Sequence, residues 1–599
     1  MNKTLTAVAT ATTLLAALVL PARLSAQKHT RYRLIDLGTL SGPHTYGSVN
    51  GDGFQLLNNS GVVASYADLA APDPNAPNCY VPDCSQAHAF RWKNGVMTDI
   101  GALPGITSSA GGSINSRGWV TGQSQNTFAD PDFNCGGVQC RAVLWKHDQI
   151  QDLGTLGGDL SLGVYVNDSG QVIGISNNGV PDPFSPFGVG DQVRTFLWEE
   201  GVMRDIGTLG GPDAIPGASC SGQPHNVIVG SSFIDSKPNT STGIPTIDPF
   251  VWKNGVMTDL GNLGGTLNFG QCGNHRGQII GVSTLAGDVQ NHAFFWEDGV
   301  MTDLGTLGGD NSEAIWLNEA GEIVGSADLA GPSGNQVHDA VIWKNGRVHD
   351  LGTVSGDPCS RGRGLNSRGQ VVGGSSDCHN FLHAFVWEEG GPMQDLNTLI
   401  QSGTGYQLTN AFNINDRGEI LAKAAPLGFT PNDDADIGHL VLLVPCEDDD
   451  ECAADVSSAN AVAPRTSAPV LMNSTVTTAP PSTSTPLAIT SGYPPGGHVG
   501  QVYLARCSRI PICLPLRSGF TVAAAGGLPP YSWSWTPQAG SSLPPGLSFP
   551  GAGGCVFATP PAICGKPTTA GSYGVVITVK DSESPPRQAS ASYVISVFP

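Results

Sequence analysis

A short sequence unit recurs along most of this 599-residue chain. One copy begins Phe294-Phe-Trp-Glu-Asp-Gly-Val-Met-Thr-Asp-Leu-Gly, and the copy before it begins Phe250-Val-Trp-Lys-Asn-Gly-Val-Met-Thr-Asp-Leu-Gly. The anchoring tryptophans are Trp92, Trp145, Trp198, Trp252, Trp296, Trp343 and Trp387. The aspartates that follow them are Asp99, Asp152, Asp205, Asp259, Asp303, Asp350 and Asp395, and an isolated Asp36-Leu-Gly38 brings the number of units to eight. A period of this length indicates a repeat architecture in which each unit packs against its neighbours.

The second half of each unit is equally regular. An Asn-x-x-Gly tetrad recurs at Asn58, Asn115, Asn167, Asn274, Asn318, Asn366 and Asn415, and only the fourth unit departs from it. Asn followed three residues later by Gly is β-turn chemistry, and the Asn-Gly or Asp-Gly after each Trp is a hairpin signal. Each unit therefore supplies four short strands, which is typical of a β-propeller blade. The predicted fold class is all-β, with about eight four-stranded blades in residues 27–445.

The two ends of the repeat region are incomplete in complementary ways. The first unit starts with a strand at Tyr32–Leu37, and the last is followed by a strand at His439–Val444 that has no partner of its own. Pairing these two strands would complete the eighth blade and remove a free sheet edge. A linear β-solenoid is the alternative, and it would not need the two ends to match.

The triplets His88-Ala-Phe90, His292-Ala-Phe294 and His383-Ala-Phe385 resemble those of the HAF family of bacterial extracellular repeats. The resemblance covers about Arg31 to Pro445. It implies export and brings no catalytic residues with it.

The N-terminal residues have the pattern of a secretory signal. Lys3 precedes an apolar stretch from about Ala7 to Leu20, and a small residue, Ala26, marks the expected cleavage point. We therefore expect residues 1–26 to be a signal peptide and the mature protein to be secreted or held at the cell surface, with the periplasm also open. The apolar stretch is too short to span a bilayer, and no later segment approaches the ~20 residues required, so we expect no membrane span.

Export would allow the cysteines to form disulfides. The fourteen are Cys79, Cys84, Cys135, Cys140, Cys220, Cys272, Cys359, Cys378, Cys446, Cys452, Cys507, Cys513, Cys555 and Cys564. Their even number fits a full set of bridges, although the sequence does not fix the connectivity. We expect close pairs such as Cys79/Cys84 and Cys135/Cys140 to be bridged within their loops. Cys220 and Cys272 occupy nearly equivalent positions in adjacent units, so we expect them to link two blades.

Two regions follow the repeats. Residues 446–486 comprise an acidic loop, Glu447–Glu451 between Cys446 and Cys452, and then a Ser-, Thr- and Pro-rich stretch that is typical of a linker. Residues 487–599 resemble the putative immunoglobulin-like domains of bacterial surface proteins at Leu543-Pro-Pro-Gly-Leu547 and Gly565-Lys-Pro-Thr-Thr-Ala-Gly571. The expected fold there is a β-sandwich, commonly a spacer or adhesion module.

The net charge and the absence of known catalytic motifs disfavour several classes of function. The formal net charge is −21, which disfavours a nucleic-acid partner. The chain has no His-Glu-x-x-His, Gly-x-Ser-x-Gly or phosphate-binding loop. An acid that recurs in every unit is more often structural than catalytic, so we expect the repeated Asp to accept hydrogen bonds at a turn.

Two acidic clusters are candidate calcium sites, because calcium favours carboxylate and amide oxygens. Their candidate ligands are Asp130, Asp132, Asn134, Asn432, Asp434 and Asp436. The glycine that follows each cluster comes one position late for an EF-hand loop, so a solvated turn is the alternative that we favour.

The longest insertions of the repeat region define a candidate binding face. They span residues 66–87, 125–140, 177–193 and 233–248, at the same place in four successive units, and must emerge on one face of a propeller. Their aromatic residues, which suit stacking against a carbohydrate or an extended peptide, include Tyr80, Phe128, Phe133, Phe184, Phe187 and Phe233.

The sequence as a whole favours an exported, non-enzymatic binding or scaffold protein. An extracellular glycan or a surface protein is the expected partner. The alternative is a propeller lyase or hydrolase that acts on extracellular polysaccharide, which would require non-repeated groups such as His225 or His275 to converge. A purely structural surface-layer role is a third hypothesis, and inert loops stapled against proteolysis are the alternative to a binding face.

Overall fold

The computed structural model describes two stretches of the chain. The first is residues 30–446, apart from 48–52, 76–78, 82–83, 106–107, 130–134, 136–137, 148, 183, 185–190, 221–223, 241, 243, 332–336, 355, 379 and 429–437. The second comprises residues 488–489, 497–498, 520–522, 524–525, 531–549, 562–565, 567–581 and 586–598.

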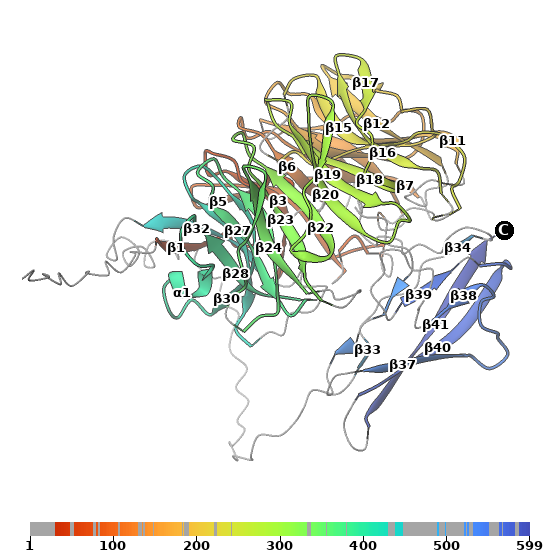
Figure 1. The fold of residues 1–599 in the computed structure, drawn as a ribbon. Coiled ribbons are helices and arrows are strands. Elements are labelled where there is room, and N and C mark those ends of the chain that lie inside the picture. Colours follow the sequence, from red (N-terminus) through yellow and green to blue (C-terminus); the bar gives the residue numbers. More distant parts are fainter. Residues whose placement is uncertain are drawn as a thin grey trace, which may run out of the picture.

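The described part of the first stretch forms eight four-stranded antiparallel units, as predicted (Figure 1). The first four are β2 (Thr45–Tyr46), β3 (Val63–Pro72), β4 (Ser85–Lys93) and β5 (Val96–Asp99); β6 (Ser109–Ile114), β7 (Val120–Ala129), β8 (Val138–Lys146) and β9 (Gln149–Asp152); β10 (Ser161–Val166), β11 (Val172–Pro181), β12 (Asp191–Glu199) and β13 (Val202–Asp205); and β14 (Ala214–Pro216), β15 (Val227–Phe233), β16 (Ile247–Lys253) and β17 (Val256–Asp259).

The remaining units continue the same order. They are β18 (Gly264–Gly273), β19 (Ile279–Leu285), β20 (Asn291–Glu297) and β21 (Val300–Asp303); β22 (Gly308–Leu317), β23 (Ile323–Leu329), β24 (His338–Lys344) and β25 (Arg347–Asp350); β26 (Cys359–Leu365), β27 (Val371–Ser376), β28 (Phe381–Trp387) and β29 (Gln394–Asp395); and β30 (Tyr406–Ile414), β31 (Ile420–Pro426), β32 (His439–Cys446) and β1 (Arg31–Asp36). A short helix, α1 (Leu396–Leu399), follows β29. No helix in the described residues has the length and apolarity needed to cross a membrane.

Each unit is a propeller blade whose first strand is innermost. Inner strands of successive blades contact one another, as β22 contacts β26 and β26 contacts β30. The outer strands carry the Val-Met-x-Asp segment and are largely exposed, whereas an inner strand such as β10 is buried throughout. The fourth and fifth blades are also joined by a parallel pairing of Ile247 with Leu267.

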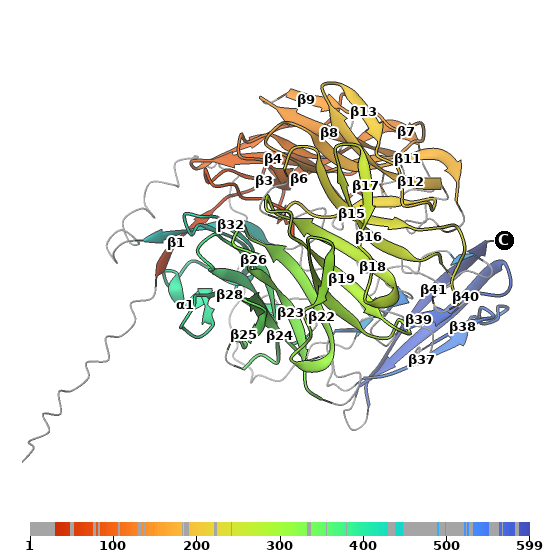
Figure 2. The ribbon, with the colours of Figure 1, turned by 45° about the horizontal axis from the view of Figure 1, so that its top comes forward.

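Strand β1 pairs antiparallel with β32, so the first strand of the chain is the outer strand of the last blade (Figure 2). Arg31 pairs with Cys446 and Asp36 with Val441. The last blade also shares an apolar cluster with the first, in which Leu421 and Leu440 pack with Leu56 and Phe90. The two incomplete ends of the repeat thus meet, as their sequences predict.

Blade packing explains two of the repeated residue types. The Phe of the HAF-type segment is fully buried, as at Phe294, and it lies over the Gly of the Val-x-Gly-x-Ser strand of its own blade. A Cβ atom at Gly281 would lie 2.6 Å from the Phe294 ring, so only glycine fits there. The anchoring Trp is a core residue, with Trp145 and Trp343 only 2% and 3% exposed.

Four disulfides are present among the described residues. Cys79–Cys84 and Cys135–Cys140 close short loops, and Cys359–Cys378 joins the ends of β26 and β27. The predicted bridge between adjacent blades is also present, with the Cα atoms of Cys220 and Cys272 6.0 Å apart. Cys446 is disulfide-bonded. Cys452, Cys507, Cys513 and Cys555 lie outside the described residues, and the side chain of Cys564 is not described.

The described C-terminal strands form an immunoglobulin-like β-sandwich. One sheet has the order β34 (Gly497–His498), β41 (Gln588–Phe598), β40 (Gly571–Lys580) and β37 (Ser532–Pro537). The others contain β35 (Phe520–Thr521), β39 (Ala562–Gly565) and β38 (Leu547–Ser548), and β33 (Ala488–Ile489) with β36 (Ala524–Ala525). Val575, Ile577 and Ile595 are among its fully buried core residues.

Candidate ligand-binding face

The four long insertions connect the second strand of a blade to its third. The connections are residues 73–84, 130–137, 182–190 and 234–246, and the corresponding connection of the fifth blade is only 286–290. The connection of the last blade, 427–438, is as long as the first, so the later connections are not all as short as the sequence suggested. Because strands alternate in direction and blades share one topology, all of these connections emerge on the same face, which we call the loop face. The Asn-x-x-Gly turns join first and second strands and therefore lie on the opposite face.

The repeated aspartate has a structural task, as its repetition predicts. Asp303 accepts a hydrogen bond from the backbone N–H of Gly305 (2.7 Å) and contacts Nδ1 of His292 (2.8 Å). His88 with Asp99 and His439 with Asp36 repeat this pairing. Burial raises the pKa of Asp99, but the bonds from His88 and Gly101 outweigh it, and the pKa is lowered. These three histidines therefore help to hold a turn inside their own blades, whereas His383 of the third HAF triplet contacts Asp357 (2.8 Å).

The sixth blade breaks this pattern. Asp339 occupies the position of the HAF histidine, so an aspartate faces the repeated aspartate, Asp350. Burial, together with the nearby Asp350 carboxylate, raises the pKa of Asp339 to about 7. At neutral pH the carboxyl group of Asp339 is thus protonated for part of the time.

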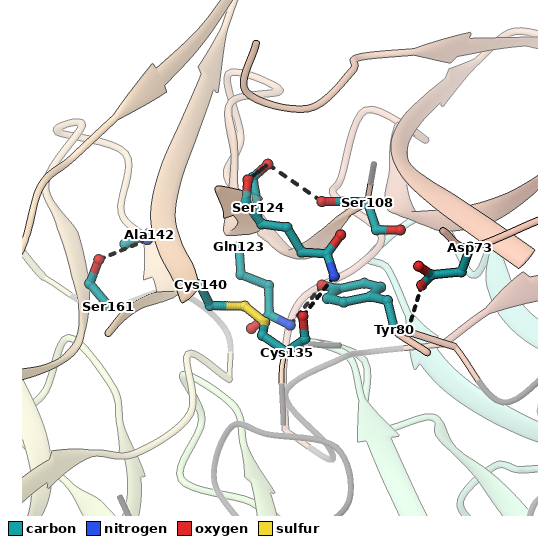
Figure 3. Close-up of a disulfide and its surroundings, with 10 residues drawn as sticks. Asp73, Tyr80, Ser108, Gln123, Ser124, Cys135, Cys140, Ala142 and Ser161 are labelled. Carbon is teal, nitrogen blue, oxygen red and sulfur yellow. Dashed lines mark hydrogen bonds between the residues drawn. A yellow bond between two sulfur atoms is a disulfide. The ribbon is translucent and has the colours of Figure 1, made fainter. Parts of the chain in front are cut away.

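Tyr80 holds two loops together and is not available as an exposed stacking ring (Figure 3). Its hydroxyl accepts a hydrogen bond from Nε2 of Gln123 (2.7 Å), and its backbone N–H donates to Asp73 (2.9 Å). Its ring packs against the apolar cluster that contains Cys135 and Cys140. The first two insertions therefore fold against each other through Tyr80 and the second disulfide.

The other predicted aromatic residues differ in placement. Phe128 is 65% exposed at the end of β7, and Phe184 is half-buried beside Asp182. Phe233 is 1% exposed and packs with Ile247, so its prediction as a ligand-contacting ring is wrong: it is the last residue of a strand and points into the core. Phe133 and Phe187 lie outside the described residues.

The six predicted calcium ligands also lie outside the described residues: Asp130, Asp132, Asn134, Asn432, Asp434 and Asp436. Among the residues that the structure describes, no group of three or more His, Cys, Asp or Glu side chains is arranged to hold a metal ion.

A cluster of non-repeated side chains lies on the inner strands of the last three blades, together with Phe381 on β28. Arg361 on β26 reaches Glu313 on β22, with 2.8 Å between its Nη2 and each carboxylate oxygen. The guanidinium of Arg363 lies 4.8 Å from the ring centre of Phe412 on β30 and 5.6 Å from that of Phe381. We call these five residues the inner cluster. Arg361 and Glu313 are each about one-third exposed, at 29% and 32%.

The inner cluster is close to the loop face. Phe381 begins β28, directly after the connection from the second strand, and Arg361 lies near the start of its strand, where the chain enters from the loop face. In the second and third blades the positions equivalent to Arg361 are Ala110 and Leu162, which belong to apolar clusters. At this position the inner strands are therefore apolar in the second and third blades, where Tyr80 packs against them. In the last three blades the inner strands carry charged and aromatic side chains instead.

The two histidines of the enzymatic alternative do not approach this cluster. Both lie between a first and a second strand, on the face opposite the loops, and His275 contacts Glu319 at 2.9 Å. They bring no catalytic group to the loop face.

Comparisons with known proteins find similar solved structures but no matching family. No family model matches the chain, and no curated protein matches its sequence. Among solved structures, Porphyromonas gingivalis dipeptidyl peptidase 4 is similar with a TM-score of 0.36 and 9% identity, over 64% of this chain and 58% of that one. The Niastella koreensis GH74 enzyme is similar with a TM-score of 0.22 and 12% identity, over 63% of this chain and 54% of that one. The chain thus matches less than two-thirds of the length of either.

Proposed function

We propose that this chain is an exported, non-enzymatic binding protein of the HAF type, whose loop face binds an extracellular glycan or a cell-surface protein. The observation that carries the proposal is that the long connections of the first four blades all emerge on one face. Insertions cost little in a surface loop, and a rigid scaffold that presents several of them is a common way to build a binding site.

Two further features support the loop face. The first two connections each contain a cysteine that forms a disulfide, and Tyr80 bonds to Gln123 on β7 and packs beside the second bridge, so both connections are cross-linked before any ligand binds. Preorganised loops lose less conformational entropy on binding. The inner cluster adds aromatic rings beside charged and hydrogen-bonding groups, a combination that suits a sugar or an extended peptide.

The experiment is a binding screen with the purified full chain against a glycan array and extracellular polysaccharides, with product analysis of each polysaccharide. We expect binding without cleavage. A matched variant in which connections 73–84, 130–137, 182–190 and 234–246 are shortened to the length of 286–290 should keep its unfolding transition and lose the ligand. Equal binding by a folded shortened variant would place the site elsewhere, and released oligosaccharides would favour the lyase or hydrolase.

A further inference from the structure

Two buried carboxyl groups face each other at the base of the third insertion. Asp182 follows β11 and is 4% exposed, and Asp213 precedes β14 in the next blade and is 3% exposed. Their side chains lie within hydrogen-bonding reach of each other. The pair therefore joins the third blade to the fourth on the loop face.

Each carboxyl group uses one oxygen for the backbone and leaves the other unsatisfied. Oδ1 of Asp182 accepts from the N–H of Phe184 (3.0 Å), and Oδ1 of Asp213 accepts from the N–H of Val193 (2.7 Å). Both Oδ2 atoms are buried and have no hydrogen-bond donor in the described structure. Ionised carboxylates only accept hydrogen bonds, so neither group satisfies the other.

The surrounding charges do not balance the ionised form of this pair. Burial, followed by the nearby Asp182, raises the pKa of Asp213 well above its usual range, and Arg194 opposes this shift only in part, so without a cation Asp213 favours its protonated form. Arg194 also faces Asp205, with 3.9 Å between Nε and Oδ2. One guanidinium thus faces three carboxylates, and the ionised set carries two uncompensated negative charges.

A second repulsion between acids acts at the other end of the same connection. Asp191 begins β12, and burial together with the charge of Asp159 raises its pKa. The connection of residues 182–190 is thus bounded at both ends by acids that repel one another. Burying two negative charges without a counter-ion costs free energy, so a bound cation would stabilise the buried pair.

We propose that Asp182 and Asp213 bind one calcium ion through their Oδ2 atoms, and that this ion fixes the third insertion to the fourth blade. The donors are oxygens, which calcium prefers, and two carboxylates supply the charge of a divalent cation. Backbone oxygens and water can complete the six to eight ligands that calcium takes. Extracellular calcium sites commonly have dissociation constants of about 0.1–1 mM, which fits an exported protein.

The test is calcium titration of the full chain after treatment with a chelator, by calorimetry and by thermal unfolding. At ten times the dissociation constant the unfolding midpoint should rise by about 1.5 °C. Asp182→Asn and Asp213→Asn should each lower calcium affinity at least tenfold, and both should still fold because they relieve repulsion. Arg194→Gln should strengthen binding, since it removes the one opposing charge.

The matched control is Asp298→Asn, because Asn94, Asn254 and Asn345 occupy the equivalent turn in other blades. It should leave calcium binding unchanged. Calcium stabilisation that persists in full in both Asp182→Asn and Asp213→Asn would overturn the proposal by placing the ion elsewhere. The proposal would also be overturned if the unfolding midpoint did not change with calcium but fell as the pH rose from 5 to 8. In that case the pair would hold a proton instead of a calcium ion.

Discussion

The side-chain amide of Asn415, in the last blade, donates a hydrogen bond of 3.1 Å to the backbone carbonyl of Asn58, in the first. The same bond links neighbouring blades from Asn58 to Asn115, Asn115 to Asn167, Asn274 to Asn318, Asn318 to Asn366 and Asn366 to Asn415. In the fourth unit, where the tetrad departs, Gln171 bonds to Asn226 instead. The repeated Asn therefore shapes its own turn and joins its blade to the next.

Replacing Asn415 tests this role. Its Oδ1 accepts from the N–H groups of Arg417 and Glu419, both at 3.0 Å, so Asn415→Ala leaves these donors and the Asn58 carbonyl without their partner. We expect a loss of about 2–3 kcal/mol in the free energy of unfolding, measured by chemical denaturation. Val256→Ala, at a residue that is 65% exposed, should cost less than about 0.5 kcal/mol. If the two substitutions lowered the free energy of unfolding equally, Asn415 would not have this structural role.

The pairing of β32 with β1 should be essential to the repeat region. Leu443 is fully buried in β32, so Leu443→Ala should cost about 3 kcal/mol, whereas Leu427→Ala, at a residue that is 66% exposed, should cost little. Deletion of residues 439–446 should abolish cooperative unfolding, because it opens two sheet edges. Thermal unfolding that is unchanged by this deletion is incompatible with the pairing.

The two classes of disulfide should differ in their contribution to stability. The Cys220–Cys272 bridge spans 52 residues and joins two blades, whereas Cys79–Cys84 spans five. In the chain-entropy account, stabilisation grows with loop length, so Cys220→Ala with Cys272→Ala should cost about 3–4 kcal/mol. The same change at Cys79 and Cys84 should cost clearly less. Non-reducing peptide mapping that finds Cys220 or Cys272 as a free thiol would reject the bridge.

The Asp339–Asp350 pair should make stability depend on pH. An acid whose pKa is raised to about 7 on folding holds a proton that the unfolded chain releases near pH 4, so stability should fall as the pH rises from about 4 through 7. Asp339→His should create the His–Asp pairing seen in the first, fifth and last blades and raise the unfolding midpoint at pH 8. Asp298→His, at an exposed turn, is the control. If Asp339→His lowers the midpoint at pH 8 while the control does not, the proposed pairing is wrong.

The sequence predicted the fold well because its repeat is regular. Aligning the units at Trp198 and Trp252 brings Cys220 and Cys272 to nearly equivalent positions, 22 and 20 residues after the tryptophan. The unpaired strand at His439 anticipates its pairing with β1. The prediction for Phe233 was wrong because β15 extends through that residue. Only the strand pairing shows where such a side chain points. The sequence did not predict that Tyr80 anchors its loop. An aromatic residue in a long loop either faces solvent or anchors the loop, and composition does not distinguish these roles.

The inner cluster was missed, although the sequence contains a signal for it. Glu313 and Arg361 each lie five residues before the Asn of their turn, where the second and third units have Ala110 and Leu162. A charged residue at a position that is apolar in other repeats points to a site. The Asp182–Asp213 pair has no such signal, because the connection and the start of the next blade meet only in three dimensions.

Hydrogen–deuterium exchange with and without the polysaccharide or surface protein selected in the binding screen tests the central claim most directly. The account predicts that the ligand slows exchange in the loop-face segments 73–84, 182–193 and 234–247 and near Arg361. Exchange at the Asn-x-x-Gly turns, such as Asn318–Gly321, should stay unchanged. Protection confined to those turns, or to the strands β37–β41, would contradict binding at the loop face.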